Sequence, residues 1–80
     1  MKGYVFNYGV DGFGADVAPA HHLGCYLDFD KALEKCKELN QKEYDNNEWI
    51  NEDYTLEETC IREDAQPLLG FYCIEEIEIF

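Results

Sequence analysis

Apolar residues at helical spacing predict one long amphipathic helix near the middle of the chain. They recur at intervals of three and four residues, which places them on one face of a helix; they are Phe29, Ala32, Leu33, Cys36 and Leu39. Asp28 can cap the first free backbone N–H groups, and Leu27 is placed to pack on Ala32. We therefore expect a helix that begins after Asp28 and ends at Asn40 or in the 45–47 run of Asp and Asn.

Aromatic and β-branched residues at both ends of the chain predict two strands. Residues 3–10 read Gly-Tyr-Val-Phe-Asn-Tyr-Gly-Val, a composition typical of strands. Residues 71–80 form the second strand, and Ile77 and Ile79, two residues apart, are expected to point inward towards the helix. The adjacent Glu75 and Glu76 interrupt the alternation of this strand, which predicts a bulge or a register adjustment.

The remaining segments have weaker patterns and complete the expected fold. Residues 15–23 and 44–53 are expected to be irregular and residues 23–27 a short strand; Thr, Ile and acidic residues alternate over 54–63, as in a strand with one solvated side. The expected order is β-β-α-β-β, an antiparallel sheet of three to four strands with one amphipathic helix packed across it. This arrangement buries both apolar surfaces, so the sequence predicts a two-layer α+β fold in a single compact domain, residues 1–80.

Acidic charge is concentrated in the second half of the chain. The 80 residues carry a formal net charge of −12, with a sequence pI near 4.2; residues 43–80 hold twelve acidic residues and one basic residue, a net of −11. This balance argues against direct binding to nucleic acid or to an anionic membrane surface. No apolar run approaches the roughly 20 residues of a membrane-spanning helix, and no export signal is expected from the first residues. We expect a soluble cytoplasmic protein, in the host cytoplasm if a phage encodes it.

The acidic segment 43–58, with seven acids and no base, has two interpretations. A net charge of about 2–8 is enough to keep a small domain soluble, so the surplus, which repels itself, favours a partner with dense positive charge. Glu76 and Glu78, about 6.6 Å apart on one face of a strand, have a spacing close to that of two nucleotides, which is compatible with a surface that imitates nucleic acid. The alternative is a merely solvated acidic face.

If the acidic half binds a partner, its charges would guide the encounter and an aromatic residue would supply the tighter hold. The expected contact residues are Asp45, Glu48, Trp49, Glu52, Asp53, Tyr54, Glu57 and Glu58. Trp49 also has an alternative interpretation as a core residue, in which case its loss would unfold the domain.

Four cysteines and two histidines are the candidate metal or redox residues. Without an export signal the thiols are expected to be reduced. Three cysteines lie among apolar neighbours, as small core residues do: Cys36, Cys60 and Cys73. His21, His22 and Cys25 bring three ligands together, but the Cys-x-x-Cys pair common in structural zinc sites is missing. We expect no metal and no cofactor; the alternative is a small metal-binding or regulatory module that uses those three residues.

The sequence offers little that is typical of an enzyme. Serine is absent, which excludes a serine hydrolase. Residues 9–14 read Gly-Val-Asp-Gly-Phe-Gly and lack the Gly-Lys-Ser/Thr of a phosphate-binding loop. Cys25 with His22 as its base is a conceivable but weakly supported nucleophilic pair. No pair of acidic residues lies among apolar neighbours, as a pair for general acid–base catalysis would. We expect a protein that is not an enzyme.

Three segments together resemble small acidic proteins of bacteriophages and mobile elements. They are residues 4–9, 29–40 and 72–79, an N-terminal strand, one helix and a terminal acidic strand. Proteins of this origin include the anti-CRISPR and anti-restriction inhibitors. The resemblance implies a defence inhibitor that occupies a basic nucleic-acid-handling surface of a nuclease or CRISPR effector complex. These inhibitors share no common motif, so no residue role follows from the resemblance, and a phage accessory protein is a further alternative.

Overall fold

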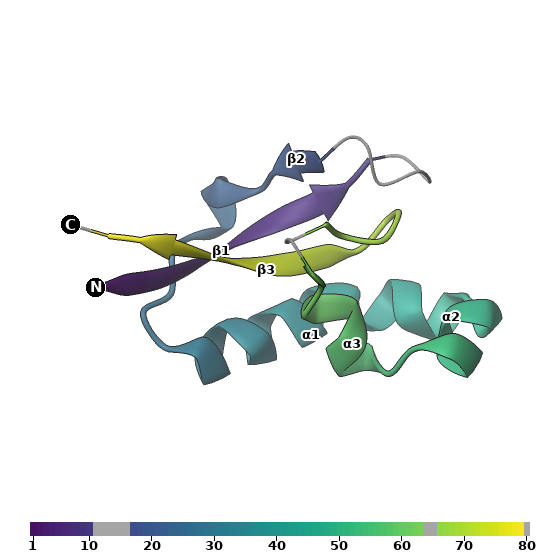
Figure 1. Ribbon diagram of the computed structural model, residues 1–80. Coiled ribbons are helices and arrows are strands. Elements are labelled where there is room, and N and C mark those ends of the chain that lie inside the picture. The colour runs from purple at the N-terminus through teal and green to yellow at the C-terminus, as the bar shows by residue number, and fades with distance from the viewer. Residues whose placement is uncertain (11–16, 64–65, 80) are drawn as a thin grey trace.

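The protein folds into two layers, a sheet and a set of helices. The computed structural model describes residues 1–10, 17–63 and 66–79. Its antiparallel sheet has three strands in the order β2-β1-β3, namely β1 (Lys2–Gly9), β2 (Val17–Pro19) and β3 (Tyr72–Glu78). A short 3-10 helix, η1 (His21–Leu23), follows β2, and then come α1 (Phe29–Asn46), α2 (Glu48–Asp53) and α3 (Leu56–Cys60). Figure 1 shows the three α-helices on one side of the sheet, which confirms the α+β class.

The order of the elements differs from the expected β-β-α-β-β. Three α-helices separate β2 from β3, and residues 54–63, predicted as a strand, contain α3 instead. Thr55 starts this helix, because its Oγ1 accepts a hydrogen bond from the Glu58 backbone N–H at 3.2 Å and its own N–H donates to Glu58 Oε1 at 3.0 Å. This reciprocal pair is a capping box, which favours a helix over a strand. Residues 44–53, predicted as irregular, lie mostly in α1 and α2.

The first half of the sheet also differs from the prediction. The second strand is β2, which lies inside the segment predicted as a loop and pairs with residues 7–9 of β1. Within residues 23–27, predicted as a strand, Tyr26 alone forms an isolated bridge, in which its N–H and C=O bond Tyr4 at 2.9 and 2.8 Å. The glycines predicted to form a turn after β1 lie mostly outside the described residues.

β1 and β3 form the longest pairing of the sheet. Their register runs without interruption from Lys2 opposite Glu78 to Tyr8 opposite Tyr72, so the predicted bulge at residues 75–76 is wrong. Alternate residues of a strand face opposite sides. The side that faces the helices carries Phe6 and Ile74, both in the main core cluster. Because the even-numbered Ile74 faces the helices, the odd-numbered residues of β3 face the opposite side.

This register corrects the predicted inner face of the last strand. Ile77 and Ile79 lie on the side of the sheet away from the helices and are half-buried. The two adjacent glutamates do not disturb the pleat, because they point to opposite sides. Glu75 accepts a hydrogen bond from Asn7 Nδ2 at 2.6 Å, and Glu76 forms an ion pair with Lys2 at 2.8 Å.

The predicted amphipathic helix is confirmed as α1. Asp28 caps it, since its Oδ1 accepts a hydrogen bond from the Asp30 backbone N–H at 2.8 Å, and the helix ends in the predicted 45–47 run. Of its apolar face, Ala32 and Cys36 are fully buried. Leu27 is 62% exposed, so it does not close the helix start over Ala32 as predicted. The buried core cluster that α1 shares with the sheet and α3 consists of Phe6, Ala20, Ala32, Cys36, Cys60 and Ile74.

Candidate functional site

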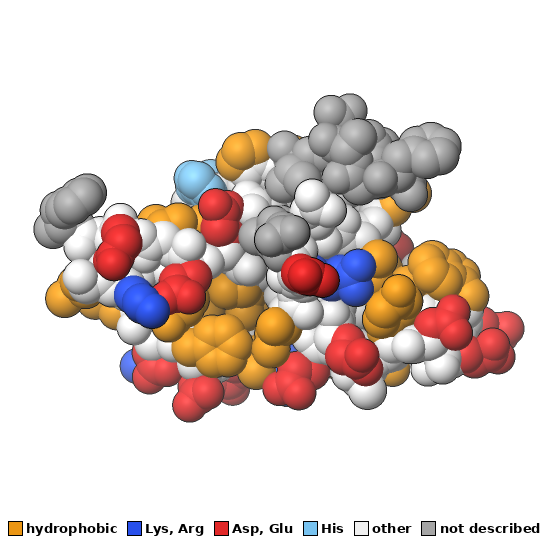
Figure 2. All heavy atoms as spheres, viewed as in Figure 1, with side chains coloured by type: hydrophobic (Ala, Val, Ile, Leu, Met, Phe, Trp, Pro, Cys, Tyr) orange, Lys and Arg blue, Asp and Glu red, His pale blue; other side chains and the backbone are white. Residues whose placement is uncertain are grey.

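The predicted contact residues gather on the helices at one end of the molecule. Asp45 lies in the last turn of α1; Glu48, Trp49, Glu52 and Asp53 lie in α2; Tyr54 follows α2; and Glu57 and Glu58 lie in α3. All of them are exposed except Tyr54, which is half-buried. We call these eight residues the acidic helical surface. In Figure 2 acidic side chains surround hydrophobic ones at the end of the molecule that α2 forms in Figure 1.

Few cations balance this surface. Among the described residues, the one ion pair that its carboxylates make is Glu57 with Lys37 Nζ at 4.0 Å. Asp45 accepts a hydrogen bond from Gln41 Nε2 at 2.8 Å, which orients its carboxylate without neutralising it. Exposed like charges on neighbouring short helices repel one another, and a cationic partner would relieve that repulsion.

Trp49 stands out on this surface because it is 57% exposed. Its neighbour Ile50 is fully buried and holds α2 against the rest of the protein. The alternative prediction, that Trp49 is a core residue, is therefore wrong. Large aromatic side chains exposed in the middle of a charged surface are typical anchors of protein–protein contacts.

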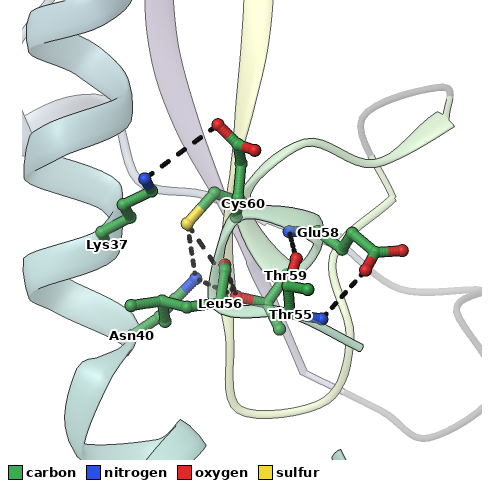
Figure 3. A network of polar contacts seen from close by, with 8 residues as sticks. Lys37, Asn40, Thr55, Leu56, Glu58, Thr59 and Cys60 are labelled. Carbon is green, nitrogen blue, oxygen red and sulfur yellow. Dashed lines mark hydrogen bonds and ion pairs between the residues drawn. The ribbon is translucent and has the colours of Figure 1, made fainter. Parts of the chain in front are cut away.

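A buried polar network fixes α3, and with it Glu57 and Glu58, against α1. Asn40 is fully buried, and its Nδ2 lies 3.2 Å from Thr59 Oγ1 and 3.4 Å from Cys60 Sγ. Thr59 Oγ1 in turn donates to the Leu56 backbone oxygen at 2.6 Å. Figure 3 shows these groups converging between α1 and α3. The part of the acidic helical surface that α3 carries is thus held against α1.

Asn40 also bonds the backbone of β3. Its Oδ1 accepts from the Tyr72 N–H and its Nδ2 donates to the Tyr72 C=O, both at 2.8 Å. The sequence reasoning missed this residue, although Asn40 lies four residues after Cys36 and so continues the buried face of α1. This spacing predicts that Asn40 is buried, but it does not reveal which backbone groups its side-chain amide contacts.

The capping box gives one carboxylate of the surface an altered acidity. The backbone N–H of Thr55, and then its side chain, stabilise the ionised form and lower the pKa of Glu58. A carboxylate with a lowered pKa contributes stability above its ordinary pKa and loses that contribution as the pH falls through the lowered value. Glu58 therefore carries its charge throughout the neutral range.

The thiols divide into one exposed and three buried groups. All four cysteines are free, and Cys25 is the exposed one. The other three are fully buried, which confirms their predicted place in the core: Cys36, Cys60 and Cys73. Burial raises the pKa of Cys73 to about 12. Hydrogen bonding to Cys60 Sγ, followed by burial, raises the pKa of Cys36, so both thiols are held protonated.

The alternative metal site gains no ligand set in the described part of the chain. His21 and His22 are exposed on η1 and Cys25 is exposed just after it. Among residues 1–10, 17–63 and 66–79, no three His, Cys, Asp or Glu side chains are grouped as metal ligands. In the same residues no helix has the length and apolar character needed to cross a membrane.

Comparisons with known proteins give no identification. No protein-family model matches this sequence, and searches of the curated proteins and of the solved structures find no match either.

Proposed function

We propose that this protein is a non-enzymatic inhibitor that binds a basic, nucleic-acid-handling surface of a bacterial defence complex through its acidic helical surface. The observation that carries the proposal is the 57% exposure of Trp49 among carboxylates that have almost no cationic partners in the described residues. An exposed tryptophan ring can be desolvated by a partner, and tryptophan is enriched among the residues that carry most of the binding energy of protein–protein contacts.

The two kinds of side chain have separate roles in this proposal. The carboxylates of α2 and α3 provide a negative potential that steers a basic partner and speeds association. Trp49 then becomes desolvated against the partner and slows dissociation. Occupation of a basic channel by this surface would exclude nucleic acid, as expected of the anti-CRISPR or anti-restriction inhibitors that the sequence resembles.

The test compares two sets of charge neutralisations in the full chain. The first set changes Glu52→Gln, Asp53→Asn, Glu57→Gln and Glu58→Gln on the acidic helical surface. The matched control changes four acids elsewhere, all exposed: Asp30→Asn, Glu34→Gln, Glu38→Gln and Glu63→Gln. Glutamine is compatible with the N3 position of a capping box, so the first set retains α3.

Phage plating on hosts that carry CRISPR or restriction systems measures inhibition directly. We expect the wild-type chain and the control set to raise plating efficiency and the first set to lose this effect. With the purified target complex, the first set should associate more slowly and with less salt dependence, and Trp49→Ala should dissociate faster. Equal inhibition by both sets, or no inhibition against any system of a broad panel, would overturn the proposal.

A further inference from the structure

Among the described residues, the outer edge of β3 has hydrogen-bond partners for its backbone only at the first residue of the strand. The N–H and C=O of Tyr72 both point away from β1, because both bond the Asn40 amide. Backbone groups two residues apart in an antiparallel strand point the same way, so those of Ile74 and Glu76 also face outward. Among the described residues, no backbone hydrogen bond from outside the β1–β3 pair reaches them. Within residues 1–10, 17–63 and 66–79 these groups are unpaired donors and acceptors, as on an unprotected sheet edge.

A groove of about 500 Å³ lies along this same edge, on the helix side of the sheet. Its apolar lining comes from Tyr4, Phe29, Ile61 and Ile74. Phe29, which packs edge-on against Tyr4, is 36% exposed, and Ile61 is 47% exposed. Figure 2 shows hydrophobic side chains exposed between the positions that β3 and α1 occupy in Figure 1.

Two carboxylates, each with an exposed cationic partner, lie beside the open edge. Glu76 and Glu78 share the helix-facing side of β3, and both side chains are at least half exposed, with Lys2 and the N-terminal amine as their partners. Arg62, the cation in the groove lining, is turned towards Tyr54, whose ring centroid lies 5.3 Å from its guanidinium carbon.

We propose that the open edge of β3, with this groove, binds an extended basic segment of a partner protein as a fourth strand. Outward backbone groups require a strand-like occupant, the apolar lining takes one hydrophobic side chain, and the glutamates take cationic ones. If the partner segment runs antiparallel to β3, its residue opposite Glu76 comes two positions before its residue opposite Ile74. The first of these partner residues is expected to be basic and the second apolar. A second copy of this chain fits the edge less well, because its own glutamates would face Glu76 and Glu78.

This surface shares no residue with the acidic helical surface and uses backbone groups of β3, so the two proposals can fail independently. The probe is a short synthetic peptide with blocked ends that contains lysine, arginine and valine in that order. These residues alternate with threonines along the peptide. A second peptide has the same sequence with the arginine and valine nitrogens methylated, which removes the donors that pair with the edge. A third contains the same residues in scrambled order.

The protein variants separate backbone pairing from charge. Glu76→Pro removes an outward N–H and leaves the pairing with β1, because that N–H does not face β1. Glu76→Gln keeps the backbone and removes the charge, and Glu34→Gln is the control at an exposed position on α1. Binding is followed by NMR amide shifts and titration.

We expect the first peptide to shift the amides of Ile74 and Glu76. Glu76→Pro or peptide methylation should weaken binding about tenfold or more, since each leaves a carbonyl unpaired. Glu76→Gln should weaken it less and reduce its salt dependence. If Glu76→Pro does not fold, the methylated peptide on the wild-type chain decides. Equal binding of all three peptides, shifts confined to α2 and α3, or a dimer of the protein alone that Glu76→Gln strengthens would overturn the proposal.

Discussion

Replacing Asn40 with aspartate tests whether the buried amide network holds the fold together. Asn40→Asp keeps the size of the side chain and leaves one oxygen to accept from the Tyr72 N–H. The other side-chain atom changes from a donor into an acceptor, and it faces the Tyr72 C=O at 2.8 Å and Thr59 Oγ1 at 3.2 Å. The hydrogen bonds that Nδ2 donates are lost, and a charge is placed where no solvent reaches.

The expected cost is large for a domain of this size. Each buried polar group left without its partner costs about 1–3 kcal/mol, and an uncompensated buried charge costs about 3–5 kcal/mol. We therefore expect Asn40→Asp to lower the free energy of unfolding by roughly 3–5 kcal/mol at pH 7. An 80-residue domain has a total of roughly 4–12 kcal/mol, so the variant should be close to unfolding.

The loss of unfolding free energy caused by Asn40→Asp should depend on pH, and the burial of the new carboxyl group determines whether it grows or shrinks. Burial raises the pKa of the new carboxyl group in the folded state above its unfolded value of about 3.9. The protonated carboxyl can donate to the Tyr72 C=O, so the variant is most stable below the unfolded pKa and loses stability as the pH rises to the folded pKa. The difference from wild type should therefore grow between pH 5 and pH 8.

Urea unfolding followed by far-UV circular dichroism at several pH values measures both effects. Asn51→Asp is the matched control, because it makes the same chemical change at an exposed position of α2. We expect the control to change the free energy of unfolding by less than about 0.5 kcal/mol. If Asn40→Asp costs no more stability than Asn51→Asp, or if its cost does not change with pH, the buried amide does not hold the fold together.

Three further outcomes follow from the geometry. Gly9→Ala should destabilise the protein by about 3 kcal/mol or more in thermal unfolding, because a Cβ there meets the backbone carbonyl of Leu68, which cannot move aside as a side chain can; a melting temperature close to wild type would contradict this. Thr55→Ala should cost about 1 kcal/mol in urea unfolding through loss of the α3 cap, and Thr55→Ser should restore most of it. Alkylation read by mass spectrometry should modify Cys25 first and Cys73 only at the rate of unfolding, whereas equal rates would place the Cys73 thiol at the surface.

The parts of the fold with long, regular patterns could be predicted from the sequence. The apolar face of α1 and the composition of β1 and β3 each extend over several residues, so one local exception does not obscure them. The segment 54–63 has two patterns at once, an alternation typical of a strand and the Thr-x-x-Glu spacing of a capping box. The capping box decides the outcome, because Thr55 and Glu58 satisfy each other's backbone groups.

The candidate site was predictable in its charge and not in its contacts. Uncompensated acids must lie at the surface, so the exposure of the carboxylates follows from composition. The exposure of Trp49 does not, since a tryptophan in a small domain is as readily a core residue. The role of Asn40 depends on Tyr72, which is 32 residues away along the chain, and local spacing contains no information about such a contact.

The exposed position of Trp49 determines what the protein's intrinsic fluorescence reports. It is the single tryptophan of the chain, and with 57% of its surface in water its indole emission should already be red-shifted in the native protein. Unfolding would then change the emission wavelength little. Capture of the ring in a dry protein–protein contact would shift the emission to the blue and shield it from a neutral quencher such as acrylamide. The emission wavelength of Trp49 should therefore report complex formation while changing little on unfolding. A binding titration can use this native fluorescence without an attached dye.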